Sequence, residues 1–323
     1  MKHIFIINPA AGRGDSLGRL EESIIDAFEK CGKENEYEIY YSACVGDALR
    51  YVRERCESEP SLPMRFYACG GDGTVNEVFC GTARAENAQV AIIPIGTGND
   101  FIKNFGSSDI FMDISAQIEG EETLIDGVRV NDRYSVNLVN MGFDCAVVES
   151  VQKIKRLPMI SSGLAYIAGV AIEFAKMPGT KLKSFTIDGK RIEKDELLLC
   201  AFANGGFYGG GFNCAPLAKT DDGMIDLCFV SRVTRLQFAT MISKYKNGTY
   251  LESKRIMKYA EYHKCKSASI DFDGEQSVCI DGEITKMSRL DIEICPKIFR
   301  LSLPKGLVKE KTEEKELEHI GAL

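Results

Sequence analysis

The first 125 residues alternate between two patterns of apolar positions. Short apolar runs have the length of buried strands, and they lie at residues 3–7, 37–41, 66–69 and 90–95. Between them, residues 17–28 and 46–56 place apolar side chains three to four positions apart, which is typical of one face of a helix. A chain that alternates strands with helices builds a parallel sheet covered by helices. We therefore expect residues 1–125 to form an α/β domain.

The pattern changes after residue 125. Short β-like runs then dominate, and they lie at 134–139, 182–187, 197–203, 224–230, 268–272, 277–280 and 290–294. Asp188-Gly189 and Asp273-Gly274 have the composition of hairpin turns. Helical periodicity is confined to residues 161–176 and 234–246. The second half predicts a separate, mainly antiparallel β domain over residues 126–295.

Three predicted strands of the first domain end in polar loops that contain glycine. The loops follow Ile7, Cys69 and Ile95, and the carboxyl ends of parallel strands share the sheet edge where ligands bind. Glycine lets the backbone approach a ligand closely, and the helix that follows Thr74 offers free N–H groups to an anion. Asp72 adds a carboxylate, which favours a divalent cation beside a phosphate. The alternative is a tight turn without a ligand. Neither Walker nor Rossmann spacing occurs.

Composition narrows the class of protein. The chain has 323 residues and a formal net charge of −7, which argues against nucleic acid as the main partner. Its twelve cysteines show no Cys-x-x-Cys spacing, and several lie inside apolar runs, as reduced buried thiols do. The start of the chain is too short an apolar run for a signal peptide, and residues 157–172 are too short to span a bilayer. We expect a cytoplasmic protein.

The second half contains two acidic turns. Thr220 to Met224 places adjacent carboxylates before a strand, where they either bind Mg²⁺ or Ca²⁺ or form an ordinary Asp-Gly turn; spacing alone favours the ordinary turn. Asp281 and Glu283 follow a strand, and a carboxylate at such a position is suited to accept a hydroxyl proton as a general base. The three histidines have no spacing typical of a metal site or a catalytic triad.

These motifs together resemble the diacylglycerol kinase catalytic family, specifically its soluble bacterial lipid kinases, which are diacylglycerol or sphingosine kinase-like. The motifs, in chain order, are Asn8-Pro9-x-x-Gly12-x-Gly14, Gly70-Gly71-Asp72-Gly73-Thr74-x-Asn76-Glu77, Gly96-Thr97-x-Asn99-Asp100-Phe101, Asp222-Gly223-Met224 and Asp281-Gly282-Glu283. The Gly-Gly-Asp-Gly-Thr element alone is shared with NAD kinases and loosely with phosphofructokinases. All five motifs in this order are far more specific. One departure is Gly98, where relatives often carry alanine.

The resemblance implies a nucleotide-binding α/β domain beside a β-sandwich-like domain, with the active site between them and residues 296–323 packing back on the first domain. It implies ATP and Mg²⁺ as cofactors. The ATP-binding residues would be Asn8, Pro9, Gly12, Ser42, Gly70, Gly71, Asp72, Gly73, Thr74, Val75, Asn76, Gly96, Thr97, Asn99 and Asp100. Asp222, with the backbone carbonyls of Lys219 and Met224, would hold a structural Mg²⁺. Glu283 would be the catalytic acidic residue, together with Asp281 and Asp72.

The function that the resemblance implies is ATP-dependent phosphorylation of a primary hydroxyl on a lipid such as diacylglycerol. An NAD kinase-like soluble kinase is one alternative, but the apolar helix at 161–176 and the aromatic loop at Phe207 and Tyr208 favour an apolar acceptor. A non-catalytic nucleotide- or lipid-binding regulator is another alternative. Such a protein is expected to have lost the acidic residues at positions 72, 100, 222 and 283. Those positions are all present. The acceptor lipid stays open.

Residues 151–177 suggest how such an enzyme reaches a lipid substrate at the membrane surface. Lys153, Lys155 and Arg156 precede an apolar helix. The helix is either buried in the core or lies at a docking surface, where the basic residues touch anionic headgroups and Leu164, Ile167 and Ala171 line the path to the active site. We expect the membrane contact to be peripheral and transient. A homodimer, common among relatives, is a further option.

Overall fold

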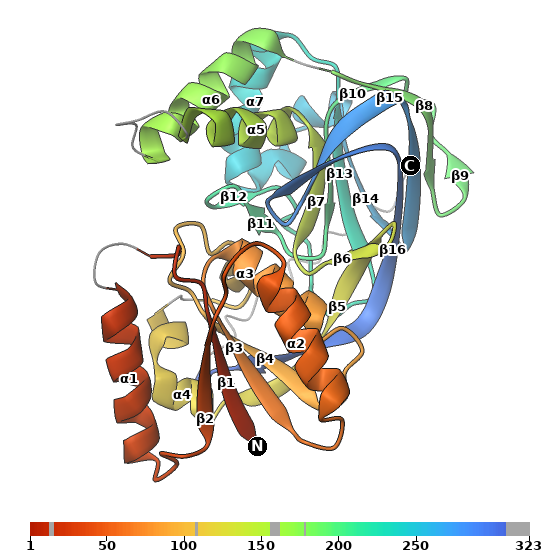
Figure 1. Cartoon of the computed structure of the whole chain (residues 1–323). Helices are drawn as coiled ribbons and strands as arrows, with labels where there is room; N and C mark the ends of the chain where they lie inside the picture. Colours follow the sequence, from red (N-terminus) through yellow and green to blue (C-terminus); the bar gives the residue numbers. More distant parts are fainter. Residues whose placement is uncertain (13–15, 107–108, 156–161, 178, 308–323) are drawn as a thin grey trace.

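The computed structural model describes residues 1–12, 16–106, 109–155, 162–177 and 179–307, and it divides into two domains (Figure 1). The N-terminal domain follows the predicted alternation. Its elements are β1 (Lys2–Ile7), α1 (Ser16–Lys30), β2 (Tyr37–Tyr41), α2 (Asp47–Ser58), β3 (Met64–Cys69), α3 (Asp72–Gly81), β4 (Ala88–Ile93), the 3₁₀ helices Phe101–Asn104 and Asp109–Met112, α4 (Ile114–Ile118) and the first part of β5 (Glu121–Val130). The four predicted strands and the two predicted helices of this domain are confirmed.

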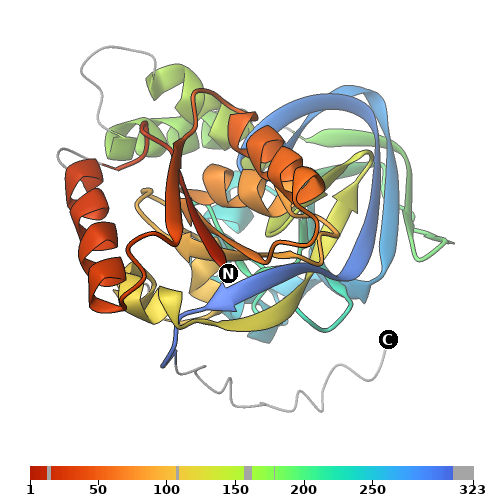
Figure 2. The same ribbon diagram turned by 60° about the horizontal axis from the view of Figure 1, so that its bottom comes forward.

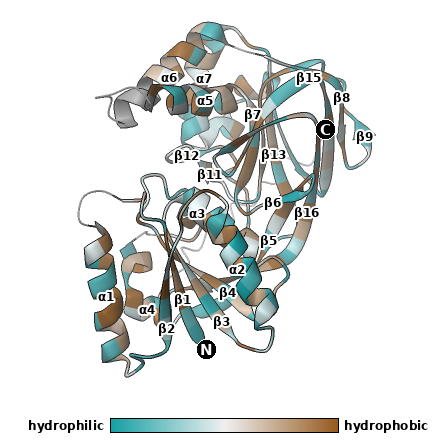
Figure 3. Ribbon diagram, viewed as in Figure 1, coloured by the Kyte–Doolittle hydropathy of each residue, from teal (hydrophilic) through white to brown (hydrophobic). Residues whose placement is uncertain are grey.

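Both faces of the N-terminal sheet are covered because its strands are apolar on both sides. Along β1, Ile4 and Ile6 pack with α2 and α3, whereas Phe5 and Ile7 pack with α1 and α4. This continuous burial is typical of parallel strands. Figure 3 shows the contrast between the apolar strands and the polar outer side of α2.

The N-terminal sheet is mixed rather than purely parallel. Strands β4, β3, β1 and β2 lie side by side and parallel, in that order. Beyond β4 the sheet continues into the end of β16 (Glu283–Leu303), which runs parallel to β4, and then into β5, which runs antiparallel to β16. The strand over residues 121–130 was not predicted. An antiparallel strand at the edge of a parallel sheet is common in large sheets.

The C-terminal domain is a β-sandwich-like structure with helices on one side. Its elements are β6 (Arg133–Ser135), β7 (Leu138–Gly142), α5 (Phe143–Lys155), α6 (Ser162–Lys176), β8 (Thr180–Ile187), β9 (Lys190–Arg191), β10 (Glu196–Ala203), β11 (Phe207–Tyr208), β12 (Phe212–Asn213), β13 (Ile225–Ser231), α7 (Arg235–Lys246), the 3₁₀ helices Thr249–Glu252 and Ile256–Lys258, β14 (Ala260–Cys265), β15 (Ser267–Ile280) and most of β16. Apart from a single pair between β16 and β4, the pairings that involve these strands are antiparallel, and one core lies inside the curved sheet while another lies between the sheet, α5 and α7.

Two local predictions for the second half differ from the structure. Helix α5 was not predicted, although Phe143, Val147 and Val151 are buried along one side of it. Asp273-Gly274 is not a hairpin turn: both residues lie inside β15, where the pairing with β16 shifts register between Asp271 and Gln276. This is a β-bulge, and the positive φ of Gly274 accommodates it. The hairpin at Asp188-Gly189 is confirmed, between β8 and β9.

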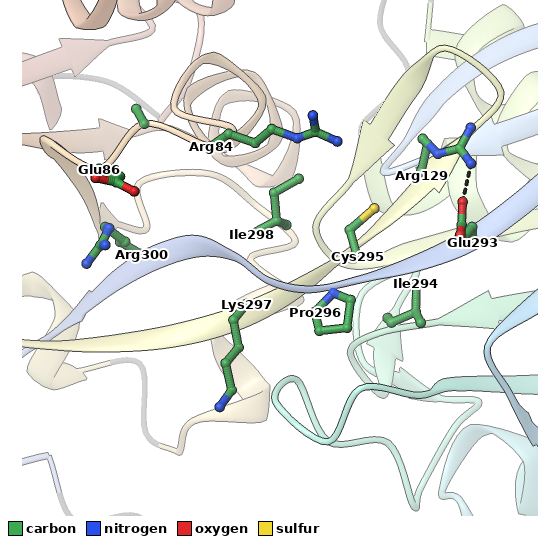
Figure 4. Close-up of a pocket in the computed structure, with 11 residues that line it drawn as sticks. Arg84, Glu86, Arg129, Glu293, Ile294, Cys295, Pro296, Lys297, Ile298 and Arg300 are labelled. Atoms are coloured by element: carbon green, nitrogen blue, oxygen red, sulfur yellow. Dashed lines mark hydrogen bonds and ion pairs between the residues drawn. The ribbon is translucent and has the colours of Figure 1, made fainter. Parts of the chain in front are cut away.

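Strand β16 passes through both domains (Figures 1 and 2). Its pairing with β5 is interrupted between Cys295 and Phe299, where Lys297 has a φ of 52°. Figure 4 shows the surface groove of about 730 Å³ at this interruption, beside the Arg129–Glu293 ion pair. The buried carboxylate of Asp126 fixes the crossing, because it accepts the N–H groups of Lys297 and Gly223. The domains are therefore joined by a paired ribbon of strands.

Helices α5 and α6 contain most of the segment predicted to lie either in the core or at a membrane-docking surface. Lys153 is 74% exposed and lies 3.9 Å from Glu149, and Ala171 is exposed. Arg156 and the side chains of Lys155, Leu164 and Ile167 lie outside the described part of the structure. Among the described residues, no helix combines the length and apolarity needed to cross a membrane. All twelve cysteines are free, and most are buried.

Candidate active site

The three glycine loops of the N-terminal domain meet at the carboxyl edge of its sheet. Asn8 Nδ2 donates to Thr74 Oγ1 at 3.1 Å, which ties the loop after β1 to the start of α3. The loop after β4 is held by a bond from Gly96 N to Gly70 O, also 3.1 Å. A Cβ atom on Gly96 would lie 2.4 Å from Gly71 Cα, so the two backbones meet this closely because residue 96 is glycine.

Asp72 links these loops through its carboxylate. Its Oδ1 accepts the backbone N–H groups of Asp100 at 2.7 Å and Phe101 at 3.1 Å. Burial raises the pKa of Asp72, and the nearby carboxylate of Asp100 raises it further. Asp100 is itself buried; it is paired with Lys103 and accepts the N–H of Gly210 from the C-terminal domain at 2.8 Å. Two carboxylates therefore lie close together at the start of α3.

Gly98 leaves a space between these two carboxylates. A Cβ atom at this position would lie 2.8 Å from Asp72 Oδ2 and 3.6 Å from Asp100 Oδ2. Oxygen ligands around a small gap suit Mg²⁺, which takes one or two carboxylates and completes its shell with water and phosphate oxygens. Asp72 Oδ2 and Asp100 Oδ2 face this gap, where the Lys103 ammonium already pairs with Asp100 Oδ1 and donates to Gly98 O; a catalytic Mg²⁺ here stays a prediction. Because residue 98 is glycine, this space is larger than it would be with an alanine side chain at this position.

A cleft of about 1160 Å³ joins the glycine loops to an apolar wall in the C-terminal domain. Of the predicted nucleotide-binding residues, those that line it are Asn8, Pro9, Ser42, Gly71, Asp72, Gly73, Thr74, Thr97 and Asp100. The wall comes mainly from α5, α6 and α7 and contains Phe143, Val147, Val148, Val151, Val170 and Ile242. One end of the cleft therefore suits phosphates and the other suits hydrocarbon.

The remaining predicted nucleotide-binding residues lie behind the surface of the cleft. Val75 packs in the core, Asn76 Oδ1 accepts a weak bond from Cys80, and Asn99 Nδ2 holds the loop through Pro94 O and Gly96 O. Gly96 allows the loops to touch, Gly70 leaves room for the Thr74 side chain, and Gly12 adopts a φ of 87°. Gly14 lies outside the described residues. These residues shape the loops, but they are not among the residues that line the cleft.

Asp281 and Glu283 are both at the cleft but have different surroundings. Asp281 is buried and accepts bonds from Ser135 Oγ and from the backbone N–H groups of residues 136, 137 and 138. Burial raises its pKa to about 6, while these donors lower it. With both oxygens occupied, Asp281 holds the chain between β6 and β7, and its contacts do not favour the predicted catalytic role.

Glu283 follows the two-residue turn Asp281-Gly282 and opens β16. It is half-buried, and its Oε2 lies 2.5 Å from Arg133 Nη2. Arg133 also donates to Thr285 Oγ1 at 3.1 Å. The guanidinium orients the carboxylate through a charge-assisted hydrogen bond. Glu283 is thus a carboxylate held by Arg133 in the lining of the cleft.

The predicted metal-binding turn lies away from the cleft. Asp222 Oδ1 accepts the N–H of Met224 at 3.1 Å, and Asp222 Oδ2 lies 2.7 Å from Lys264 Nζ, which also pairs with Asp226 at 3.1 Å. An ammonium group is therefore already paired with the Asp222 carboxylate. Among the described residues, no cluster of three or more His, Cys, Asp or Glu side chains could hold a metal ion. Metal binding by Lys219, Asp222 and Met224 stays a prediction that these contacts do not favour.

Several residues of the site were not predicted. Arg133 and Lys103 are paired with predicted acidic residues, and Glu77 accepts the N–H groups of Gly46, Ala48 and Leu49, which fixes the loop that contains Ser42. Asp144 and Lys246 line the apolar end of the cleft. Only Glu77 belonged to a recognised motif. The others come from segments whose proximity depends on the tertiary fold.

Family comparisons agree with this geometry over nearly the whole chain. The model of the diacylglycerol kinase catalytic domain matches residues 2–130. The model of the YegS C-terminal NAD kinase beta sandwich-like domain matches residues 137–303.

Individual relatives extend the match. The chain is 27% identical over 302 residues to a diacylglycerol kinase of Bacillus subtilis, covering 90% of this chain and 95% of the relative. It is 30% identical over 240 residues to a "Probable lipid kinase YegS-like" of Chromohalobacter salexigens, covering 71% and 74%. A crystal structure of a diacylglycerol kinase from Bacillus anthracis shares the fold, with a TM-score of 0.66, 23% identity and coverage of 95% and 98%. The chain therefore belongs to the diacylglycerol kinase family of lipid kinases.

Proposed function

We propose that the protein transfers the γ-phosphoryl group of ATP to the primary hydroxyl of an acylglycerol lipid, with diacylglycerol as the first acceptor to test. The observation that carries this proposal is the single cleft that joins the glycine loops to the apolar wall of α5, α6 and α7. A kinase for a lipid needs these two environments in contact, because the phosphate donor is polar and the acceptor is mostly hydrocarbon. The names of the relatives supply diacylglycerol.

The phosphate end would bind the nucleotide. Gly71, Gly73 and Thr74 lie at the start of α3, where backbone N–H groups and the helix dipole favour phosphate oxygens. Asp72 and Asp100 would hold Mg²⁺. The ion would neutralise charge on the phosphates while the γ-phosphoryl group is transferred. Ser42 lies at the edge of the same cleft, on the loop that Glu77 fixes. Bound in this way, the γ-phosphate would point toward the C-terminal domain.

Glu283 would act on the acceptor hydroxyl. The hydroxyl oxygen forms a bond to the γ-phosphorus, the bond between that phosphorus and the β,γ-bridging oxygen breaks, and ADP leaves. The hydroxyl proton passes to the Glu283 carboxylate, which Arg133 orients. Asp281 contributes by fixing the turn from which Glu283 projects. Positioning and charge neutralisation supply most of the rate acceleration in such transfers.

The first test is a comparison of acceptors. The purified protein is incubated with labelled ATP, Mg²⁺ and either dioleoylglycerol in detergent micelles or NAD in solution. We expect label in phosphatidic acid and none in NADP, because the wall of the cleft offers hydrocarbon contacts in place of the polar groups that a dinucleotide requires. Label in NADP alone would support the NAD kinase alternative. Nucleotide binding without transfer to either acceptor would support a regulator.

We also propose that the surface around α5, α6 and α7 docks transiently on anionic membranes. Ile172 on α6 and Leu236 on α7 are large apolar side chains exposed to solvent, and Arg235 Nη2 joins the helices by donating to Ala175 O at 2.6 Å. Lys153 is exposed on α5. Basic residues beside exposed apolar side chains suit the interface between headgroups and acyl chains. Val170 of α6 lines the cleft, so this surface adjoins the proposed acceptor path.

Changing Lys153, Lys155 and Arg156 together to glutamine should weaken binding to vesicles that contain anionic lipid. Each basic residue near such a surface contributes about 1 kcal/mol, so the loss should approach 10²-fold at low salt and shrink as salt is added. Co-sedimentation with phosphatidylglycerol vesicles measures it. The matched control changes Lys190 and Arg191, which are exposed on β9 at the other side of the domain. Equal binding of wild type, triple variant and control would place docking elsewhere.

A further inference from the structure

The apolar end of the cleft contains a carboxyl group that the proposed phosphoryl transfer does not use. Asp144 lies in the first turn of α5 and lines the cleft, between Phe143 and the valines Val147 and Val148. Its burial in this apolar wall raises its pKa to about 6. A carboxyl group in an apolar wall costs free energy unless something binds it. Asp144 is therefore an unusual residue for a surface that only contacts hydrocarbon.

One hydrogen bond to Asp144 is made by the protein itself. Tyr208 Oη donates to Asp144 Oδ2 from the β11–β12 hairpin. Among the described residues, Asp144 has no ion pair, and Lys246, which also lines the cleft, holds its ammonium over the ring of Phe212 at 5.6 Å. The second oxygen, Oδ1, has no hydrogen-bond donor among the described residues, and the Asp144 residue is partly exposed at the cleft. It is an open hydrogen-bond acceptor at the cleft.

Asn140 supports the same interpretation from the neighbouring strand. It lines the cleft on β7, is only 3% exposed, and its Oδ1 has no donor partner within the described residues. Buried polar side chains are almost always satisfied, so an unsatisfied one beside a cleft is free to bind a water molecule or a ligand atom. Asn140 pairs with Cys279, two residues before Asp281, which places it roughly 7 Å along β15 from the turn that carries Glu283.

We propose that Asp144, oriented by Tyr208 and accompanied by Asn140, binds a second hydrogen-bond donor on the acceptor lipid, a few bonds from the hydroxyl that is phosphorylated. The donor is a free hydroxyl or an ammonium group. Diacylglycerol has neither, because its other two oxygens are esterified, whereas a monoacylglycerol or a long-chain amino alcohol has one. Asp144 is thus a specificity-determining residue that raises the efficiency of acceptors with a second donor relative to diacylglycerol. This inference rests on the proposed lipid kinase activity.

The test is the ratio of kcat/KM between matched acceptors in wild type and in Asp144→Asn. Dioleoylglycerol, 1-oleoylglycerol and a long-chain amino alcohol are presented in the same micelles with saturating ATP and Mg²⁺. In the variant we expect kcat/KM for the two donor-bearing acceptors to fall roughly 10- to 100-fold, through KM, while the value for dioleoylglycerol stays within about twofold. The two kinds of donor can be told apart by the size of the fall. The amino alcohol loses an ion pair with Asp144, so its kcat/KM should fall further than that of 1-oleoylglycerol, which loses only a hydrogen bond.

The matched control is Glu149→Gln, which removes a carboxylate from the same helix without altering the cleft wall. It should leave all three ratios unchanged. Tyr208→Phe provides a second variant that keeps the Asp144 charge but removes its partner; it should alter the same ratios in the same direction by a smaller factor. An equal change for all acceptors in Asp144→Asn, or no change, would overturn the inference. Absence of activity on every lipid in wild type would instead contradict the proposed function.

Discussion

Glu283→Gln should lower kcat for lipid phosphorylation by about 10²- to 10⁴-fold, the range for loss of a general base. The amide keeps the size and the hydrogen-bonding oxygen of Glu283 but cannot accept the hydroxyl proton. KM for ATP should hardly change, since the nucleotide loops lie in the other domain and Glu283 contacts none of them among the described residues. Steady-state kinetics with varied ATP and varied lipid separate the two parameters.

Glu293→Gln is the control for this prediction. Glu293 lies on the same strand and is paired with Arg129, as Glu283 is with Arg133, but it lies at the groove shown in Figure 4, away from the cleft. Its variant tests what loss of a strand-bound ion pair does by itself. We expect nearly full activity. Full turnover by a folded, ATP-binding Glu283→Gln protein would remove Glu283 from the transfer step.

Asp72→Asn should lower kcat/KM roughly 10²-fold and raise the Mg²⁺ concentration that supports half-maximal activity. A metal ion contributes several kcal/mol of charge stabilisation in such reactions, and Asp72 is one of the two carboxylates proposed to hold it. Asparagine can still accept the N–H groups of Asp100 and Phe101 through its Oδ1, so the loop contacts are kept while the charge is lost. Activity measured over a range of Mg²⁺ concentrations gives both quantities.

The melting temperature of Asp72→Asn shows whether its loss of activity comes from unfolding. Because burial and Asp100 raise the pKa of Asp72, its charged form is disfavoured in the free protein, and removing that charge should not lower the melting temperature at neutral pH. Asp113→Asn, which changes a helix-capping carboxylate on α4 outside the cleft, is the comparison. If Asp72→Asn keeps the wild-type Mg²⁺ dependence, the metal is held by other groups.

Periodicity predicted the N-terminal domain well because its strands are buried on both faces and its helices on one. Helix α5 carried the same signal, since Phe143, Val147 and Val151 recur every four residues and are buried together. Its valines obscured that signal, because β-branched residues favour strands. Local composition likewise could not distinguish a hairpin from a bulge at Asp273-Gly274. The partner strand decides which one forms.

Some parts of the candidate site could likewise be predicted from the sequence, and others could not. The glycine loops could be predicted because each lies next to its own strand, and topology brings the ends of parallel strands together. Arg133 could not be linked to Glu283, nor Lys264 to Asp222, since each pair joins segments distant in sequence. Asp144 belongs to no recognised motif. Its proposed role depends on the apolar side chains around it, and these come together only in the folded chain.

The crossing of β16 has a consequence for the order in which the chain folds. Residues 299–303 at the end of this strand pair with residues 121–125 of β5, and Leu301 also pairs with Val90 of β4. The sheet of the first domain is thus completed by almost the last residues of the described chain. During synthesis that domain has an unprotected edge at β4 until the C-terminal domain has emerged, and an open edge invites pairing with other chains. A fragment that ends near residue 125 should therefore aggregate, whereas the full chain should fold.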